Sequence, residues 1–254
     1  MILSRVSAWL YTFDSWDYAF EFYDRYFYYL FVVALSYLPT IYLLSKWMEN
    51  REPFDLRWPL FCWNLFIGIF SILGTYYTFP AFISLSRELG LTTVSCDYRT
   101  YQYGPVAFWI LAFLNSKVLE FVDTIFIILR KKRLITLQWY HHIVTMLYCW
   151  YAGATALGPG LPFAAMNYLV HGIMYPYFAF ATIGYRMKFV QWITWLQIAQ
   201  MIAGTYITFE SLKCNDPRYF TFMFGFLMYL SYFILFTKFY YDKYLKDNKI
   251  KKIH

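Results

Sequence analysis

Three ionisable residues stand at helical spacing inside an otherwise apolar stretch of this sequence. Lys117, Glu120 and Asp123 follow one another at intervals of three residues, so a helix would present all three on one face. Ionisable groups within apolar helices are costly and usually face a protein interior or a water-filled cavity. The group predicts either a substrate-binding face or an internal ion pair between Lys117 and Glu120 that fixes helix packing.

Three of the four histidines lie in the two apolar stretches that follow. His141 and His142 are adjacent and come one helical turn after Gln138, and His171 comes one turn after Asn167. A neutral imidazole can act as a nucleophile or a general base without a metal or a cofactor. The pattern predicts imidazole chemistry, and the alternative for any one of these residues is a buried histidine held by a hydrogen bond.

Metal chemistry is the competing interpretation of the histidines. Adjacent residues on a helix point about 100° apart, so His141, His142 and His171 are awkward ligands for one zinc ion. A di-iron desaturase would need more ligands than the four histidines present, one of which is the last residue. No Cys/His spacing typical of zinc occurs. We therefore expect no metal and no cofactor.

Gln197 and Gln200 add a polar pair to the next apolar stretch. Their simplest role is hydrogen bonding between helices. Four consecutive apolar stretches thus carry a polar face, which predicts a shared interior cavity. Beyond that cavity the sequence is aromatic and aliphatic, which would suit an acyl chain.

Membrane-spanning helices are the elements that would position these residues. The chain has 254 residues, of which 60% are hydrophobic, 25% aromatic and only 15% charged, whereas soluble domains have about a quarter charged. Its long uncharged runs fit helices of about 20 residues. We expect an all-α fold with seven spans near residues 26–45, 59–83, 105–129, 137–152, 163–184, 189–210 and 219–241, and a hairpin at residues 158–162 between the fourth and fifth.

The basic residues predict the orientation of these spans. Fifteen of the 22 Lys and Arg fall in one set of loops and six in the opposite set, and cytosolic loops carry the excess. We therefore expect one membrane domain over residues 1–254, with residues 1–25 in the lumen and residues 242–254 as a cytosolic Lys-rich tail. The net charge of +7 reflects this topology rather than a nucleic-acid partner.

The cysteines and the C-terminus fit the same topology. Cys96 and Cys214 both fall in predicted lumenal loops, whereas Cys62 and Cys149 fall inside spans. An oxidising lumen permits the first two to pair, and we expect that disulfide. The end Lys251-Lys252-Ile253-His254 is similar to the dilysine retrieval signal of endoplasmic-reticulum membrane proteins, and a solvated basic tail is the alternative.

Four segments, in order between residues 115 and 201, together resemble the sequence boxes of the ELO family of fatty acid elongases. One position departs from the pattern, because Gln138 stands where most members have His; glutamine is a known variant there. The segments are Asn115–Thr124 with Leu129–Lys132 for the KxxExxDT box, Gln138–His142 for HxxHH, Asn167–Tyr175 for NxxxHxxMY and Thr194–Met201 for TxxQxxQ.

The resemblance implies that acyl-CoA condenses with malonyl-CoA, by way of an acyl-histidine, to give 3-oxoacyl-CoA, CO₂ and CoA. It implies seven transmembrane helices around an acyl-chain tunnel in the endoplasmic-reticulum membrane. Carried over residue by residue, it makes His141 the nucleophile, places His171 across the cavity and has His142 position the thioester or the malonyl group. Asn167 and Lys117 would bind the developing oxyanion or the malonyl carboxylate. Further substrate-binding candidates are Glu120, Asp123, Gln138, Tyr175, Gln197 and Gln200, and the CoA phosphates would meet Arg130, Lys131, Lys132 and Arg133.

The partners that follow are the acyl-CoA and malonyl-CoA substrates, membrane lipid, and the ketoreductase, dehydratase and enoyl reductase of the elongation cycle. A homodimer is left open. The forms of the histidine boxes favour saturated and monounsaturated acyl chains, whereas Gln138 is similar to some elongases of polyunsaturated chains.

Two other functions fit the polar spans. A transporter or channel would line its path with the same side chains. Helices broken by Gly or Pro in an internal repeat would favour such a protein. No repeat occurs in this sequence, and Pro176 is the main proline inside a predicted span. The third interpretation is a family-like protein that has lost its activity through Gln138.

Overall fold

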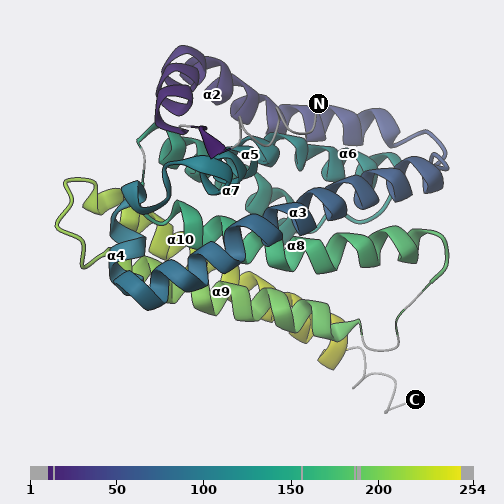
Figure 1. The fold of residues 1–254 in the computed structure, drawn as a ribbon. Coiled ribbons are helices and arrows are strands. Elements are labelled where there is room, and N and C mark those ends of the chain that lie inside the picture. Colours follow the sequence, from purple (N-terminus) through teal and green to yellow (C-terminus); the bar gives the residue numbers. More distant parts are fainter. Residues whose placement is uncertain (1–10, 14, 156, 186, 188–189, 247–254) are drawn as a thin grey trace, which may run out of the picture.

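The chain folds as a bundle of long helices, described by a computed structural model (Figure 1). The structure describes residues 11–13, 15–155, 157–185, 187 and 190–246, and the side chains of all of these except 15–20, 24, 27 and 30. In chain order the elements are α2 (Ser15–Met48), α3 (Arg57–Leu89), α4 (Leu91–Cys96), η1 (Tyr98–Tyr101), α5 (Gly104–Leu119), α6 (Phe121–Leu129), α7 (Thr136–Ala154), α8 (Gly160–Thr182), α9 (Gln191–Ser211), α10 (Tyr219–Tyr240) and η2 (Tyr241–Lys246). The predicted all-α class is confirmed.

Three of the described helical segments are both long enough and apolar enough to cross a membrane. They are Phe31–Met48 within α2, Arg57–Leu89 and Tyr219–Lys246. Helices α7, α8 and α9 also reach 19, 23 and 21 residues, but they carry many of the polar residues of the predicted site. The apolar helices fit a membrane protein, and the count of seven spans and the acyl-chain tunnel stay predictions.

The predicted third span, over residues 105–129, is interrupted in its middle. Helix α5 ends at Leu119 and α6 begins at Phe121, with Glu120 between them. The amide of Asp123 bonds to the carbonyl of Glu120 three residues earlier, at 3.2 Å, which tightens the turn locally. The prediction of one continuous helix is therefore wrong here, and the Glu120 carboxylate lies at a junction between two helices.

Small residues allow α3 and α8 to lie along each other through the middle of the bundle (Figure 1). A Cβ atom on Gly68 would come within 2.8 Å of the Pro176 ring, and one on Gly74 within 2.6 Å of the Tyr168 ring. Such close approach is typical of small residues in packed membrane helices. Around this pair, α2 packs on α6 and α7, and α9 packs on α10.

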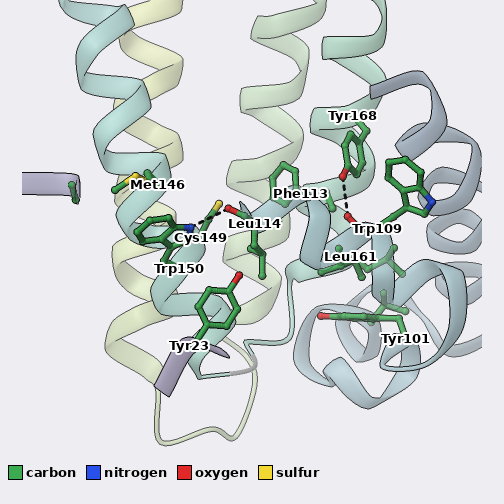
Figure 2. Packing of buried hydrophobic residues seen from close by; sticks show 14 residues of the cluster. Tyr23, Tyr101, Trp109, Phe113, Leu114, Met146, Cys149, Trp150, Leu161 and Tyr168 are labelled. Carbon is green, nitrogen blue, oxygen red and sulfur yellow. Dashed lines mark hydrogen bonds between the residues drawn. The ribbon is translucent and has the colours of Figure 1, made fainter. Parts of the chain in front are cut away.

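Buried aromatic residues connect α5 to the two helices that carry the histidines (Figure 2). The Tyr168 hydroxyl on α8 donates to the Trp109 carbonyl at 2.9 Å, and the Trp150 indole on α7 donates to the Leu114 carbonyl at 3.1 Å. Buried hydroxyl and indole groups need such partners. These contacts hold α7 and α8 against α5, and therefore place their histidines relative to Glu120.

Covalent and polar contacts close the end of the bundle that carries α4. Cys96, at the end of α4, and Cys214, after α9, are joined by a disulfide with their Cα atoms 5.6 Å apart. The Thr92 hydroxyl donates to Glu210 at 2.8 Å and adds a second connection between α4 and α9.

The predicted hairpin at residues 158–162 is shorter than expected, because α8 begins at Gly160. Pro162 therefore lies in the first turn of α8, where a proline loses no helical hydrogen bond.

Basic residues gather at the opposite end, where the α2–α3 loop meets the end of α6. The Phe54 amide donates to the Leu129 carbonyl at 3.0 Å, and Lys131 Nζ donates to the Glu49 carbonyl at 3.0 Å. The predicted dilysine end and the basic residues Arg186 and Lys188 lie outside the described residues.

Candidate active site

A cavity of about 780 Å³ extends from the basic end into the bundle, between residues of α3 and α6 to α10. It includes most of the residues that the sequence predicts for the site. Those on its wall are Glu120, Asp123, Arg130, Lys132, Gln138, His141, His142, Asn167, His171, Tyr175, Gln197 and Gln200.

Three of the predicted residues do not line this cavity: Lys117, Lys131 and Arg133. The Lys117 side chain is only 1% exposed and is paired with Glu120, which lines the cavity while Lys117 does not. Lys131 turns to the Glu49 carbonyl instead. The positions of these residues do not support the predicted contacts of Lys117 with substrate or of Lys131 and Arg133 with phosphate.

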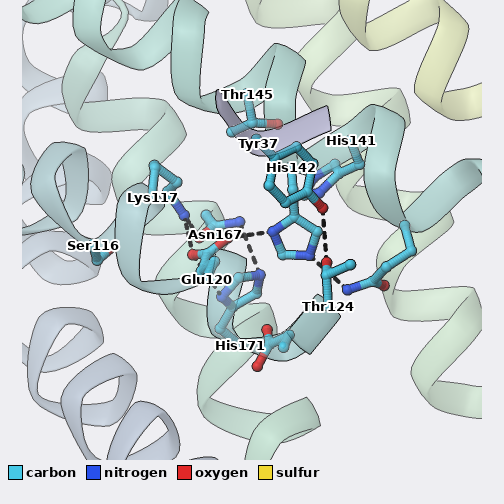
Figure 3. A network of polar contacts seen from close by, with 12 residues as sticks. Tyr37, Ser116, Lys117, Glu120, Thr124, His141, His142, Thr145, Asn167 and His171 are labelled. Carbon is cyan, nitrogen blue, oxygen red and sulfur yellow. Dashed lines mark hydrogen bonds and ion pairs between the residues drawn. The ribbon is translucent and has the colours of Figure 1, made fainter. Parts of the chain in front are cut away.

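Glu120 is the centre of the polar cluster that Figure 3 shows. Its Oε1 atom lies 2.5 Å from Lys117 Nζ and 3.7 Å from His171 Nδ1, and its Oε2 atom lies 3.8 Å from His142 Nδ1. Lys117 Nζ also donates to Asn167 Oδ1 at 3.0 Å. Since a buried charge is stable only when it is paired and hydrogen-bonded, Lys117 is the counter-ion that keeps this carboxylate inside the bundle.

Each of the two imidazoles beside Glu120 also contacts an amide one turn earlier on its own helix. Gln138 Nε2 lies 2.7 Å from His142 Nε2, and Asn167 Nδ2 lies 3.2 Å from His171 Nε2. The spacing of four residues brings such side chains together on a helix. Both rings are therefore oriented between an amide and a carboxylate.

His141 has a different environment from the other two histidines. Its ring lies in the cavity wall against Tyr232, at 4.9 Å between ring centroids, and Phe236, at 6.5 Å. Among the described residues, no hydrogen bond engages its ring nitrogens. The Tyr232 hydroxyl bonds to Thr145 at 2.9 Å and to the backbone carbonyl of His141 at 3.4 Å. In a neutral His141 ring, one nitrogen lone pair is therefore not engaged by any described residue.

Residues 22–252 match the model of the ELO: GNS1/SUR4 family. The chain belongs to this family. The resemblance of its four boxes to those of the ELO family is thus confirmed.

Similar proteins are named as elongases. The very long chain fatty acid elongase 6 of Gallus gallus is 40% identical over 233 residues, which are 88% of this chain and 87% of the relative. The elongase of the same name from Mus musculus is 41% identical over 232 residues, covering 87% and 86% of the two chains. A putative fatty acid elongase 3 of Caenorhabditis elegans is 38% identical over 224 residues, covering 85% of this chain and 70% of the relative.

Asp123 lies on the cavity wall of this ELO protein, but both of its oxygens are already bound. Trp63 Nε1 donates to Oδ1 at 2.6 Å, and the Tyr175 hydroxyl donates to Oδ2 at 2.5 Å. The Tyr175 ring also packs on His171, with centroids 5.1 Å apart. Asp123 therefore connects α3 and α8, and its part in the site is to hold Tyr175 beside His171.

The sequence did not indicate Trp63, and it did not distinguish two basic residues of the cavity from the other predicted cytosolic Lys and Arg. An indole N–H in an apolar helix needs an acceptor when it is buried, but the sequence does not identify a carboxylate 60 positions away as that acceptor. Arg57 and Lys243 line the cavity mouth together with Arg130 and Lys132. In the sequence, Arg57 and Lys243 stand out only as basic residues near the ends of predicted spans. That position does not show which basic residues lie together at the cavity mouth.

The predicted glutamines lie deeper, on α9. Gln197 Nε2 contacts Met174 Sδ at 3.1 Å, a contact between α9 and α8, and Gln200 is buried at the wall. In the described part of the chain, no three His, Cys, Asp or Glu side chains are grouped as metal ligands would be.

Proposed function

We propose that this chain is the condensing enzyme of fatty acid elongation, which joins acyl-CoA and malonyl-CoA to give 3-oxoacyl-CoA, CO₂ and CoA. Family membership and relatives named as elongases support a role in very-long-chain fatty acid elongation. The observation that carries the chemistry is His141, whose ring lines the cavity with no hydrogen bond from the described residues.

The first step transfers the acyl group to His141. The imidazole lone pair attacks the thioester carbonyl, the carbon–sulfur bond breaks, and CoA leaves as a thiolate that takes up the imidazole proton. The resulting acyl-imidazole is reactive enough to pass the acyl group on. The rings of Tyr232 and Phe236, which pack on His141, would limit its hydrolysis by excluding water.

The second step forms the new carbon–carbon bond. Malonyl-CoA loses its carboxylate as CO₂, and the electron pair of the broken bond makes an enolate. The enolate carbon attacks the acyl carbonyl, the carbon–nitrogen bond to His141 breaks, and the imidazole regains a proton. Over both steps one proton is consumed, which balances the loss of the malonyl carboxylate.

The cavity has two ends that suit the two ends of an acyl-CoA. Arg57, Arg130, Lys132 and Lys243 would attract the phosphates at the mouth. The cavity wall also contains apolar residues such as Met174, Met201 and Phe236, on which an acyl chain would pack. We place the mouth on the cytosolic side of the endoplasmic-reticulum membrane, in keeping with the basic residues there.

The test is release of CO₂ from malonyl-CoA labelled in its free carboxyl group. The purified chain, in lipid vesicles, receives labelled malonyl-CoA with a long-chain acyl-CoA. Labelled CO₂ and 3-oxoacyl-CoA in equal amounts are expected. Movement of an acyl-CoA across the vesicle membrane without release of CO₂ would favour a transporter. If a folded protein shows neither CO₂ release nor transport, the chain is a family member that is inactive as a condensing enzyme.

A further inference from the structure

Asn167 connects Lys117 to His171 through two hydrogen bonds, and the chemistry of the ammonium group decides which atom donates in each. An ammonium group has donors and no acceptor. Lys117 Nζ, 3.0 Å from the side-chain oxygen of Asn167, must therefore donate to that oxygen. The orientation of the Asn167 amide follows, because its NH₂ group is then the end that faces His171 (Figure 3).

The amide orientation in turn decides which nitrogen of His171 carries a proton. Asn167 Nδ2 is a donor, so His171 Nε2, at 3.2 Å, must be the acceptor and must be unprotonated. In the neutral ring the proton then lies on Nδ1. That nitrogen faces Glu120 Oε1 at 3.7 Å, and a carboxylate favours an N–H in this position.

The second imidazole lacks such a fixed direction. Gln138 contacts His142 in the same way, at 2.7 Å, but among the described residues no donor bonds to Gln138 Oε1. The Gln138 amide can therefore present either its oxygen or its NH₂ group to His142, so it does not select a tautomer. The feature that fixes the amide in one pair and not in the other is the lysine behind Asn167.

We propose that Lys117 and Asn167 are positioning residues that hold His171 in the tautomer with its proton on Nδ1 and a lone pair on Nε2. The tautomer itself follows from the hydrogen bonds, and only its consequence for catalysis rests on the proposed function. That consequence is that His171 can accept a proton at Nε2 but cannot donate one from it. For Lys117 the assignment replaces the direct contact with substrate that the sequence suggested, and it gives Asn167, on the cavity wall, a positioning role. Lys117 acts from behind the cavity wall.

The proposal is tested by nitrogen NMR of the full chain with ¹⁵N-labelled histidine, in lipid. Protonated and unprotonated ring nitrogens differ clearly in chemical shift, and the signals of His171 are those that disappear in His171→Gln. The unmodified chain should show a protonated Nδ1 and an unprotonated Nε2. A protonated Nε2 in the unmodified chain overturns the proposal, and this measurement needs no variant of Lys117 or Asn167.

Asn167→Asp gives the second measurement. A carboxylate would accept from Lys117 and also from His171, so the proton should move to Nε2. The matched control, Gln138→Glu, should leave the His171 signals unchanged. We expect kcat to fall at least about tenfold in Asn167→Asp, because a wrong tautomer disables an otherwise intact site, with little change in KM. Unchanged His171 signals in Asn167→Asp would overturn the proposal.

The two proposals fail separately. If no CO₂ is released by the unmodified chain while His171 shows the expected signals, the condensing function is wrong and the tautomer assignment stands. If CO₂ is released while His171 carries its proton on Nε2, the assignment is wrong and the condensing function stands.

Discussion

His141 differs from its neighbours by its freedom to react. His142 and His171 each lie between an amide and Glu120, whereas the described residues give the ring nitrogens of His141 no hydrogen bond. A nucleophile must offer a lone pair, and Nε2 of His142 or His171 would first have to break its contact with the amide. Nδ1 of His142 has no hydrogen bond among the described residues, but it faces Glu120 at 3.8 Å. The geometry favours His141 over the other two histidines as the acyl carrier.

Incubation of the purified chain with acyl-CoA alone should therefore release about one CoA per active enzyme and then stop. The acyl mass should map to a peptide that contains His141. His141→Ala should lose both this burst and turnover, while Gln138→His should keep both. A full burst in His141→Ala, with the label on His142 or His171, would move the nucleophile. Normal turnover without any acyl-enzyme would favour direct attack in a ternary complex.

The Lys117–Glu120 pair should matter for stability as well as for the site. Lys117→Met would leave the buried Glu120 carboxylate without its ammonium partner, and loss of one member of such a pair costs about 3–5 kcal/mol. The double variant Lys117→Met/Glu120→Gln should lose less stability than Lys117→Met, because no unpaired charge remains. Thermal unfolding in detergent measures both. Equal losses in single and double variants would show that the ion pair does not set the stability.

At the scale of elements, the cavity mouth is built from separate parts of the chain. Arg57 begins α3, Arg130 and Lys132 follow α6, and Lys243 lies in η2 after α10. Hydrogen bonds from Phe54 to Leu129 and from Lys131 to Glu49 hold the first two parts together. Cations at a shared mouth attract phosphates more strongly than cations spread over a surface.

Removing two of these cations should weaken the binding of CoA esters. We expect Arg57→Gln with Lys243→Gln to raise KM for acyl-CoA by about tenfold or more, since charge-assisted contacts are the strong ones, and to reduce its dependence on salt. The control is Lys46→Gln with Arg133→Gln, which removes equal charge from two residues that do not line the cavity. A similar rise in KM in the control would mean that general surface charge, and not the mouth, attracts the substrate.

At the scale of the whole molecule, the disulfide closes a loop between residues separated by 118 positions. Crosslinks of this kind typically stabilise by about 2–4 kcal/mol. Cys96→Ser should therefore lower the midpoint of thermal unfolding, whereas Cys62→Ser, which changes an exposed free cysteine, should not. Peptide mapping without reduction should find Cys96 joined to Cys214. Free thiols at both positions would contradict the pairing.

The orientation of the bundle can be tested independently of its chemistry. We expect seven spans with the N-terminus in the lumen and the C-terminus in the cytosol, because basic residues favour the cytosolic side. Tags at both ends, probed with protease in sealed microsomes, should be reached only at the C-terminus. Tags on the same side would exclude an odd number of spans and would put the position of the mouth in doubt.

The sequence by itself determined the features that depend on local spacing. Apolar runs predicted an all-α bundle, and intervals of four residues placed Gln138 beside His142 and Asn167 beside His171. Such neighbours on a helix are set by the helical repeat alone. The boxes also indicated the family, since their order and spacing are properties of the chain.

The tertiary structure decided which of these faces meet. Glu120 lies between His142 and His171 because α7 and α8 pack around the break between α5 and α6. The same packing puts Lys117 behind the carboxylate and lets Trp63 and Tyr175 donate hydrogen bonds to Asp123. It also brings Arg57 and Lys243 to the mouth. Spacing along a helix fixes the direction of a side chain, but its partner depends on how neighbouring helices are rotated and shifted. That arrangement depends on packing across the whole bundle, including the glycine contacts of α3 with α8.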